Sequence, residues 1–429
     1  MAEKTKSHVE NITLEQVPES EKKSWLSIAF IWAGNVICVP ALMVGAMVSA
    51  GLNFKDSILA MFIGYGITVA LMMLIAAQSA QTGRPSMVAV SRALGERGSQ
   101  FTISLITAIS MIGWYGYQTI VCATSFCSLM KSGFGISFPE WVACLLWGTL
   151  MLITAFYGIG LTKILNVVSV PLLFVFLIYG VSLALGDGGA AVLAAYEPAE
   201  SSGMMVGITI SIGGFISGAA TCGDYNRYSK DAKSAALSCL FGVIPAGVGA
   251  LACGAVLAIC SGDSDITVMF ANVGLPIVGM LVLILATWTT NVGNAYSAGI
   301  AVVNVFKLKD DKRAAVTAIC GIIGILLSLG GIVYYFVDFL SILSYLITPI
   351  CAVLIADYWV MGKGKAEEWA PFPGVNWLGI VAWLTGAVVT YLNKVFLPEI
   401  TGIAVTIVIY WILCKVVKNP KYNPFAKEA

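Results

Sequence analysis

The sequence predicts an all-α integral membrane protein that crosses the bilayer many times. Of its 429 residues, 59% are hydrophobic and only 11% are charged, and the mean hydropathy is +0.89. Soluble proteins carry about 25% charged residues. A membrane-spanning helix needs about 20 apolar residues, and the chain divides into apolar segments of that order. Two of these segments carry interruptions at corresponding places, which predicts two related halves.

Twelve apolar segments lie between polar connections, and each is expected to be a transmembrane helix. They cover approximately residues 25–52, 56–79, 102–130, 140–159, 163–185, 204–222, 234–261, 275–305, 314–330, 333–356, 376–396 and 399–417. Residues 1–24 and 418–429 are polar tails. The N-terminal tail does not resemble a cleavable signal peptide, so the first segment is expected to remain as a membrane helix.

Breaks are predicted in the first and sixth segments. The first contains Gly34 and Pro40, and a proline removes one backbone donor from a helix. The sixth contains the pair Gly213-Gly214 and then Gly218. Glycine destabilises a helix interior by about 1 kcal/mol relative to alanine. The glycine pair has two interpretations: a notch for close helix packing, or an unwound stretch that lines a binding site.

The two broken segments open two halves of five helices each, residues 25–185 and 204–356, offset by about 180 residues. Because five is odd, the second half enters the membrane from the opposite side and the repeat is inverted. Residues 376–417 then form two peripheral helices. Paired broken helices in an inverted repeat indicate the central site of a transporter.

The distribution of basic residues predicts that both termini are cytoplasmic. In this orientation only Lys55, Lys131 and Lys394 of the 24 basic residues fall in outer loops. The single histidine, His8, lies in the polar tail, which excludes histidine chemistry within the membrane. The eleven cysteines form no CxxC pair and are expected to be small buried hydrophobes. A net charge of +1 gives no indication of nucleic-acid binding.

The third segment carries Trp114 and Gln118, which are four residues apart and share one helical face. Tryptophan favours membrane interfaces, so Trp114 either packs or contacts lipid, or it provides a flat stacking surface. A glutamine amide in hydrocarbon needs polar partners. The pair therefore predicts a surface that stacks on a planar molecule and hydrogen-bonds to it.

The eighth segment contains Thr289, Thr290, Asn291 and Asn294. Such polar residues can hold neighbouring helices together. Alternatively, threonine hydroxyls and unwound carbonyls form an oxygen cage suited to Na⁺.

The polar and glycine-rich clusters of the third, sixth and eighth segments contain no charged residue. Charged residues lie towards segment ends instead: Asp224, Arg227, Asp338 and Asp357. These four are expected to be capping, loop or gate charges. A charged substrate usually requires a countercharge at membrane depth, so the centre favours a neutral, planar molecule. An enzyme is not expected, because no nucleophile, acid–base pair or metal cluster is placed there.

Several motifs, in this order and spacing, resemble the nucleobase–cation symporter family, closest to its bacterial cytosine permeases. The motifs are Gln81-Thr82-Gly83, Gly113-Trp114-Tyr115-Gly116, Gly214-Phe215-Ile216-Ser217, Asp224-Tyr225-Asn226-Arg227-Tyr228, Trp288-Thr289-Thr290-Asn291 and Ile355-Ala356-Asp357-Tyr358. The resemblance implies a LeuT-type fold of ten core helices and two peripheral helices, working by alternating access. It also implies a multi-pass protein of the bacterial inner membrane that functions as a monomer.

The resemblance implies that the base stacks between Trp114 and Phe215. Its edges would be read by the Gly213 and Gly214 backbone, Ser217, Gln118, and Asn291 or Asn294. The coupling ion Na⁺ would be bound by carbonyls of Gly34, Ile37 or Cys38 and of Ala286, together with the hydroxyls of Thr289 and Thr290. No organic cofactor is expected.

Two positions depart from the family pattern. Met111 stands where cytosine permeases tend to carry a glutamine, and Gln118 has a placement similar to that in hydantoin-type members. Ala286 offers only its carbonyl where some relatives have a side-chain oxygen. The predicted function is Na⁺-coupled import of a neutral nucleobase, with cytosine first. The alternative is a related heterocycle (a hydroxymethylpyrimidine, hydantoin, allantoin or purine) or H⁺ coupling.

Overall fold

The computed structural model describes residues 17–426, except 158, 187, 264–268, 270–275 and 394, and excluding the side chains of 156–170, 276, 278 and 310. Residues 1–16 and 427–429 of the two predicted tails therefore lie outside the described residues. The described chain is helical, with a single isolated β-bridge between Lys23 and Ser229. The all-α prediction is confirmed.

Each of the twelve predicted segments coincides with a helix. The first holds α1 (Trp25–Val36) and α2 (Val39–Ala50). The other helices are α3 (Phe54–Thr82), α4 (Ser86–Ala89), α5 (Glu96–Phe134), α6 (Glu140–Tyr157), α7 (Ile159–Leu185), α8 (Gly189–Ala195), α9 (Met204–Ala220), α10 (Gly223–Asn226), α11 (Ala232–Ser261), α13 (Pro276–Phe306), α14 (Arg313–Leu329), α15 (Phe336–Ile355), α16 (Trp377–Leu392) and α17 (Pro398–Val416).

Among the described residues, six helices are long and apolar enough to cross a membrane, or up to eight if each bent pair counts as one span. Three shorter apolar helices lie at Glu140–Ala155, Arg313–Leu329 and Trp377–Leu392. The protein is therefore a multi-pass membrane protein, whereas the number of twelve crossings and the limits of the two repeats remain predictions.

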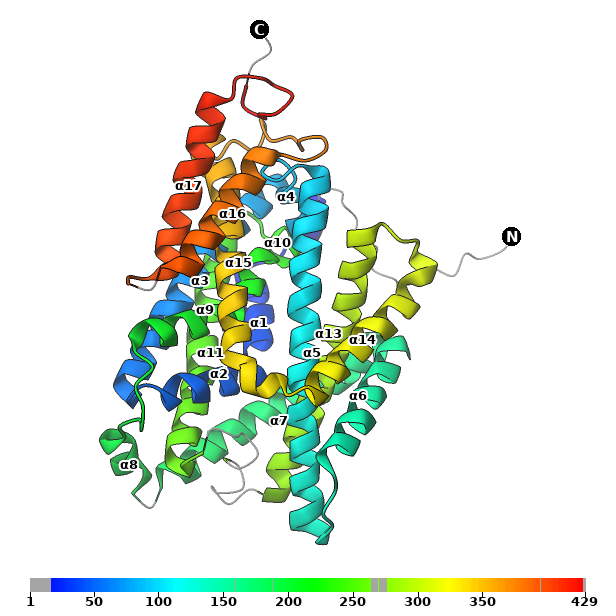
Figure 1. Ribbon diagram of the computed structural model, residues 1–429, viewed down its shortest axis with the longest axis vertical. Coiled ribbons are helices and arrows are strands. Elements are labelled where there is room, and N and C mark those ends of the chain that lie inside the picture. Colours follow the sequence, from blue (N-terminus) through cyan, green and yellow to red (C-terminus); the bar gives the residue numbers. More distant parts are fainter. Residues whose placement is uncertain are drawn as a thin grey trace.

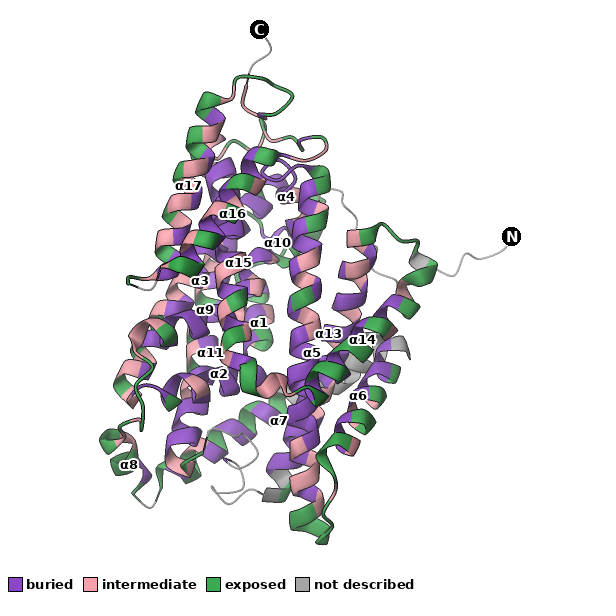
Figure 2. Cartoon of the chain, in the orientation of Figure 1, coloured by how far each residue is buried: buried purple, intermediate pink, exposed green. Residues whose placement is uncertain are grey.

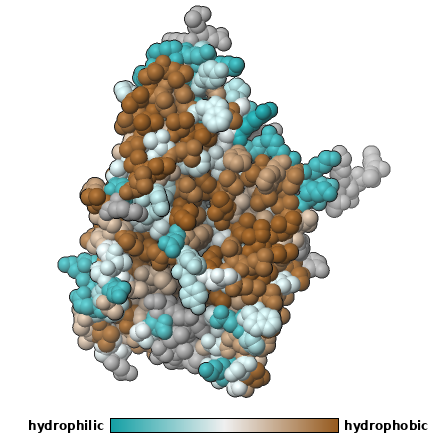
Figure 3. Space-filling model, viewed as in Figure 1, coloured by the Kyte–Doolittle hydropathy of each residue, from teal (hydrophilic) through white to brown (hydrophobic). Residues whose placement is uncertain are grey.

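The helices form a bundle in which α5 runs through most of the height of the molecule beside α13 and α14 (Figure 1). Helix α11 packs on α1, α2 and α3, while α9 lies between α3 and α15. Helices α16 and α17 pack on each other along one flank (Figure 1). Buried residues face the interior (Figure 2), and the surface over α16 and α17 is broadly apolar (Figure 3), as lipid contact requires.

The predicted break in the first segment is present. Helices α1 and α2 meet at an angle of 62° across Ile37 and Cys38. Pro40 occupies the first turn of α2, where its missing amide is not needed for a helical hydrogen bond.

The sixth segment does not break where the sequence predicted. Helix α9 continues through Gly213 and Gly214 and ends at Ala220, before a turn at Thr221–Cys222 and the short α10. A Cβ at position 213 would lie 2.0 Å from the Leu340 carbonyl oxygen of α15. The prediction that the glycine pair opens the backbone is therefore wrong, and Gly213 instead allows α9 and α15 to approach closely.

Candidate substrate and cation site

A cavity of about 1340 Å³, here the central cavity, lies among α1, α5, α9, α10, α13 and α15. It reaches the protein surface at Ser20 and Glu21, which are exposed. Its charged lining residues come from the segment before α1 and from α10 and the turn after it. These residues are Glu21, Lys22, Lys23, Asp224 and Arg227. The remaining lining is polar, aromatic or aliphatic.

Four of the predicted site residues line the central cavity: Phe215, Ser217, Thr290 and Asn294. Helix α9 supplies the first two and α13 supplies the others. The Ser217 hydroxyl lies 3.1 Å from the hydroxyl of Ser110 on α5. The cavity thus joins an aromatic ring to hydroxyl and amide groups from α9 and α13, without a charged side chain among these four residues.

The Phe215 ring already has aromatic neighbours in this arrangement. It stacks on Tyr65 of α3 with ring centroids 5.9 Å apart and an interplanar angle of 13°. The edge of Trp32 lies 6.2 Å away, at 88°. These contacts fix the ring at the cavity wall, so its free side can stack on a planar molecule.

Trp114 does not line the central cavity and is only 7% exposed. Phe336 and Phe339, at the start of α15, lie edge-to-face against it at 5.7 Å and 5.6 Å. The structure therefore does not bring Trp114 and Phe215 together around a common space. Met111, one turn before Trp114, does line the cavity.

Gln118 is buried, and its Oε1 accepts no hydrogen bond. A buried amide oxygen without a donor is destabilising by about 1–3 kcal/mol. Gln118 is also absent from the lining of the central cavity.

Asn291 does not face the cavity. Its Nδ2 donates to the Tyr115 carbonyl and to the Thr119 hydroxyl of α5, both at 3.0 Å. Asn294 Nδ2 donates to Asn291 Oδ1 at 3.3 Å. Asn291 therefore joins α13 to α5, whereas Asn294 connects this contact with the cavity. Gly213 and Gly214 are likewise absent from the cavity lining.

The predicted cation ligands on α13 lie together. The hydroxyls of Thr289 and Thr290 both donate to the Ala286 carbonyl, at 3.0 Å and 2.9 Å. Three oxygens are thus gathered on one turn of helix, an arrangement whose hard oxygen donors suit Na⁺. Thr290 also lines the central cavity.

The break between α1 and α2 leaves two carbonyls without their usual helical donors. The amides of Ile37 and Cys38 donate to Ala33 and Val36, so neither reaches the Gly34 carbonyl. The Ile37 carbonyl also has no helical donor, because Pro40 has no amide hydrogen and the Ala41 amide donates to the Cys38 carbonyl. The Gly34 and Ile37 carbonyls thus have lone pairs available for a cation, whereas the Cys38 carbonyl, like that of Ala286, already accepts hydrogen bonds.

Trp32, which lines the cavity, is held by Asn226, and the sequence motifs do not predict this contact. Trp32 Nε1 donates to Asn226 Oδ1 at 2.9 Å, and Asn226 Nδ2 donates to the Ser238 hydroxyl at 2.8 Å and to the Ala235 carbonyl. One buried amide therefore ties α10 to α1 and α11. The only sequence signal was Asn226 within the Asp224–Tyr228 motif.

A family model described as "Permease for cytosine/purines, uracil, thiamine, allantoin" matches residues 16–413. The chain belongs to this permease family. The predicted family is confirmed, and the protein is a transporter of nucleobase-related compounds rather than an enzyme.

Curated relatives of this permease are themselves permeases. The cytosine permease of Escherichia coli K12 is 28% identical over 390 residues, covering 88% of this chain and 90% of the relative. The hydantoin permease of Microbacterium maritypicum is 26% identical over 428 residues, covering 90% and 84%.

The fold of the permease is shared with a solved transporter. The structure of Mhp1 in its inward-facing conformation superposes with a TM-score of 0.81 at 21% identity, covering 96% of this chain and 95% of that chain. This similarity confirms the predicted LeuT-type fold class.

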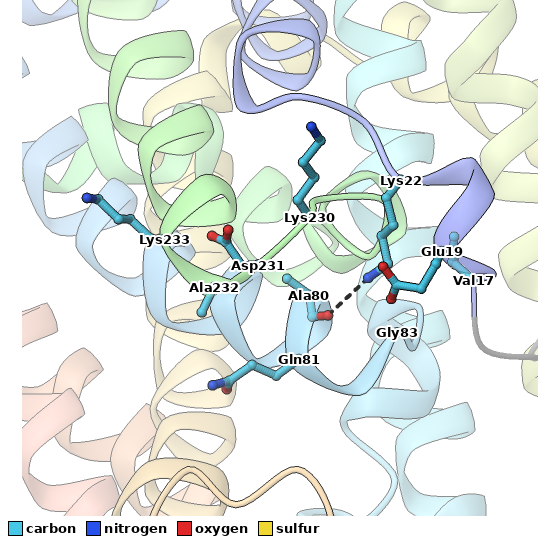
Figure 4. A pocket seen from close by; sticks show the side chains of 10 residues that line it. All are labelled: Val17, Glu19, Lys22, Ala80, Gln81, Gly83, Lys230, Asp231, Ala232 and Lys233. Carbon is cyan, nitrogen blue, oxygen red and sulfur yellow. Dashed lines mark hydrogen bonds between the residues drawn. The ribbon is translucent and has the colours of Figure 1, made fainter.

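A second pocket of the permease, about 530 Å³, lies beside the N-terminal segment and the start of α11 (Figure 4). It combines Glu19 and Asp231 with Lys22, Lys230 and Lys233, and it contains no aromatic side chain. The backbone amide of Ser234 donates to Asp231 at 2.7 Å and lowers the pKa of that carboxyl. This pocket offers no face on which a planar neutral base could stack.

Proposed function

We propose that this permease imports a neutral nucleobase, cytosine first, by Na⁺-coupled symport with alternating access. The observation that carries the proposal is the central cavity. It combines the Phe215 ring with the Ser217, Thr290 and Asn294 side chains. The charged side chains that line it come from the segment before α1, from α10 and from the turn after α10. A neutral planar base can stack and form hydrogen bonds in such a site without a countercharge.

The base would stack on Phe215 and, in the substrate-bound arrangement, on Trp114. This requires Phe336 and Phe339 to withdraw from Trp114, which a shift at the start of α15 accomplishes. The unpaired Gln118 Oε1 would then accept a hydrogen bond from a ring or exocyclic N–H. Ser217 and Asn294 would read the remaining polar edges of the base.

Na⁺ would lie between the α1–α2 break and α13. The Gly34 and Ile37 carbonyls would face the Ala286 carbonyl and the Thr289 and Thr290 hydroxyls across this contact, since α2 packs on α13. Bound there, the ion would supply the positive charge that balances these oxygens. The bound ion would hold the broken helix against α13 and so keep the cavity wall near Thr290 in one arrangement. Substrate affinity would therefore depend on whether Na⁺ is bound.

We place the protein in the bacterial inner membrane as a monomer, with both termini cytoplasmic. The basic residues support this orientation. The central cavity opens beside Lys22 and Lys23, so the described arrangement would be inward-open.

The alternative is a related heterocycle or H⁺ coupling. The similarity to a hydantoin permease and the position of Gln118 one turn after Trp114 favour a related heterocycle as the substrate. A thermal-stability panel separates the candidates: purified protein is heated with cytosine, hydantoin, allantoin, hydroxymethylpyrimidine or adenine, in Na⁺ or in K⁺. We expect the largest stabilisation with cytosine in Na⁺. A larger effect of another heterocycle would replace cytosine, and equal effects in K⁺ would contradict Na⁺ coupling.

A further inference from the structure

Glu399 is a buried glutamate that takes no part in the proposed substrate and cation site. It lies in the first turn of α17 and is 0% exposed. The hydroxyl of Ser344 on α15 donates to its Oε1 at 2.9 Å. Its second oxygen, Oε2, is buried and accepts no hydrogen bond.

Among the described residues, the Glu399 carboxyl has no cationic partner. In the described part of the chain, no lysine or arginine nitrogen lies within 4.0 Å of it. Burying an ionised carboxylate without a countercharge in a membrane protein is costly. Desolvation disfavours the charged form, whereas a neutral carboxylic acid needs no countercharge.

The polar groups around Glu399 come from several helices. Thr209 of α9 places a second hydroxyl beside the carboxyl, in addition to that of Ser344. Tyr345 of α15 is a titratable neighbour of Glu399 and also interacts electrostatically with Asp338. The ring centroids of Tyr345 and of Tyr391 on α16 are 6.2 Å apart. Asp357 and Tyr358 also pack against α17, but they do so near Tyr410. Tyr410 lies about 16 Å from Glu399 along the axis of α17.

The two hydroxyl groups beside Glu399 belong to helices that form the central cavity. Thr209 precedes Phe215 on α9 by six residues, and Ser344 precedes Ile347 on α15 by three residues; both Phe215 and Ile347 line the cavity. A rearrangement of α9 against α15 must therefore change the surroundings of Glu399.

We propose that Glu399 is a proton-binding site whose occupancy is linked to the relative position of α9 and α15. In the described arrangement the carboxyl holds a proton. When the two helices separate and water enters, the O–H bond breaks, the proton passes to water and the carboxylate keeps the electron pair. Glu399 thereby makes the transport cycle depend on pH, in addition to any dependence on Na⁺.

Infrared difference spectroscopy of the purified protein tests the site without requiring transport. We compare wild type with Glu399→Gln and with Glu140→Gln, which alters an exposed glutamate in the first turn of α6. At neutral pH we expect loss of a carboxylic-acid C=O band in Glu399→Gln only. The absence of that difference would overturn the proposal, whatever the transport activity.

Uptake into proteoliposomes gives the functional readout, which rests on the proposed transport function. Between about pH 5 and about pH 9, we expect wild type and Glu140→Gln to lose uptake on the alkaline side and Glu399→Gln to lose this dependence. If uptake by wild type and by both variants depends on pH in the same way, the proposed link between Glu399 protonation and transport is overturned. An absence of nucleobase uptake in wild type would contradict the proposed function alone, since the infrared result stands independently.

A second variant covers the case in which Glu399→Gln does not fold. Ser344→Ala keeps the carboxyl but removes the hydrogen bond to Oε1, which favours the ionised form. We expect the midpoint of the infrared titration to move upward by about one pH unit. An unchanged midpoint would contradict the assignment of the band to Glu399.

Discussion

Arg92 Nε donates to Asp357 Oδ2 at 2.8 Å, and both side chains are buried. The hydroxyl of Tyr410 on α17 donates to the other carboxylate oxygen, at 2.8 Å. The Arg92 guanidinium also donates to the Glu368 carbonyl and stacks on Phe425. This pair therefore ties the connection after α4 to the end of the tenth segment, to a peripheral helix and to the C-terminal segment.

Replacing Arg92 with methionine should reduce the free energy of unfolding by about 3–5 kcal/mol, because Asp357 remains buried without its countercharge. Thermal unfolding in detergent measures the change. Lys365→Met is the matched control, since Lys365 pairs with Glu368 at the surface of the connection between α15 and α16. An exposed pair contributes about 0–1 kcal/mol. Equal losses in both variants would show that the buried pair has no special role.

Gly213→Ala should destabilise the protein, because the added Cβ would lie 2.0 Å from the Leu340 carbonyl oxygen. Gly249→Ala on α11 is the control, since its Cβ meets no atom within 4 Å. The control should be neutral or stabilising by up to about 1 kcal/mol, through helix propensity. Thermal unfolding of both variants distinguishes a packing notch from an unwound segment. A neutral Gly213→Ala would favour the unwound segment.

Phe215→Ala should weaken nucleobase binding by about 1–3 kcal/mol, which corresponds to roughly 5- to 150-fold in affinity. Trp114→Ala should cause a loss of the same order if the base reaches it in the bound arrangement. Equilibrium binding of labelled cytosine measures both. Trp147→Ala serves as the control, because Trp147 packs on Phe126 and Trp288 and does not line the cavity. Wild-type affinity in the Trp114 variant would remove that residue from the site.

Thr290→Ala should weaken cytosine binding at low Na⁺ and less at high Na⁺, because excess ion compensates for a lost ligand. Thr290→Ser keeps the hydroxyl and should behave like wild type. Binding isotherms over a series of Na⁺ concentrations separate these outcomes. An equal loss at every concentration would place Thr290 with the substrate rather than with the ion.

Much of the fold could be predicted from the sequence. Apolar segment length reports membrane helices directly, because every backbone polar group in lipid must be paired within the segment. The break at Ile37–Cys38 was also predictable, since Pro40 removes an amide wherever it stands. The glycines at 213 and 214 were ambiguous, because a missing Cβ serves close packing and unwinding equally well. Only the position of Leu340 decides between them.

The site was less predictable, because side-chain direction depends on the tertiary arrangement. Phe215 and Asn294 reach the cavity, while Asn291, three residues before Asn294, faces α5 instead. Trp32 and Tyr65 frame Phe215 from helices that carry no distinctive motif at those positions. Asp357 could be recognised as an end charge, but its partner Arg92 is 265 residues away in the chain.

Uptake of radiolabelled cytosine into proteoliposomes, with and without an inward Na⁺ gradient, tests the proposed function most directly. A panel of unlabelled heterocycles competes in the same assay. We expect accumulation only with the Na⁺ gradient, and the strongest competition from cytosine itself. Accumulation that is independent of Na⁺, or stronger competition by a hydantoin or a purine, would contradict Na⁺-coupled cytosine import.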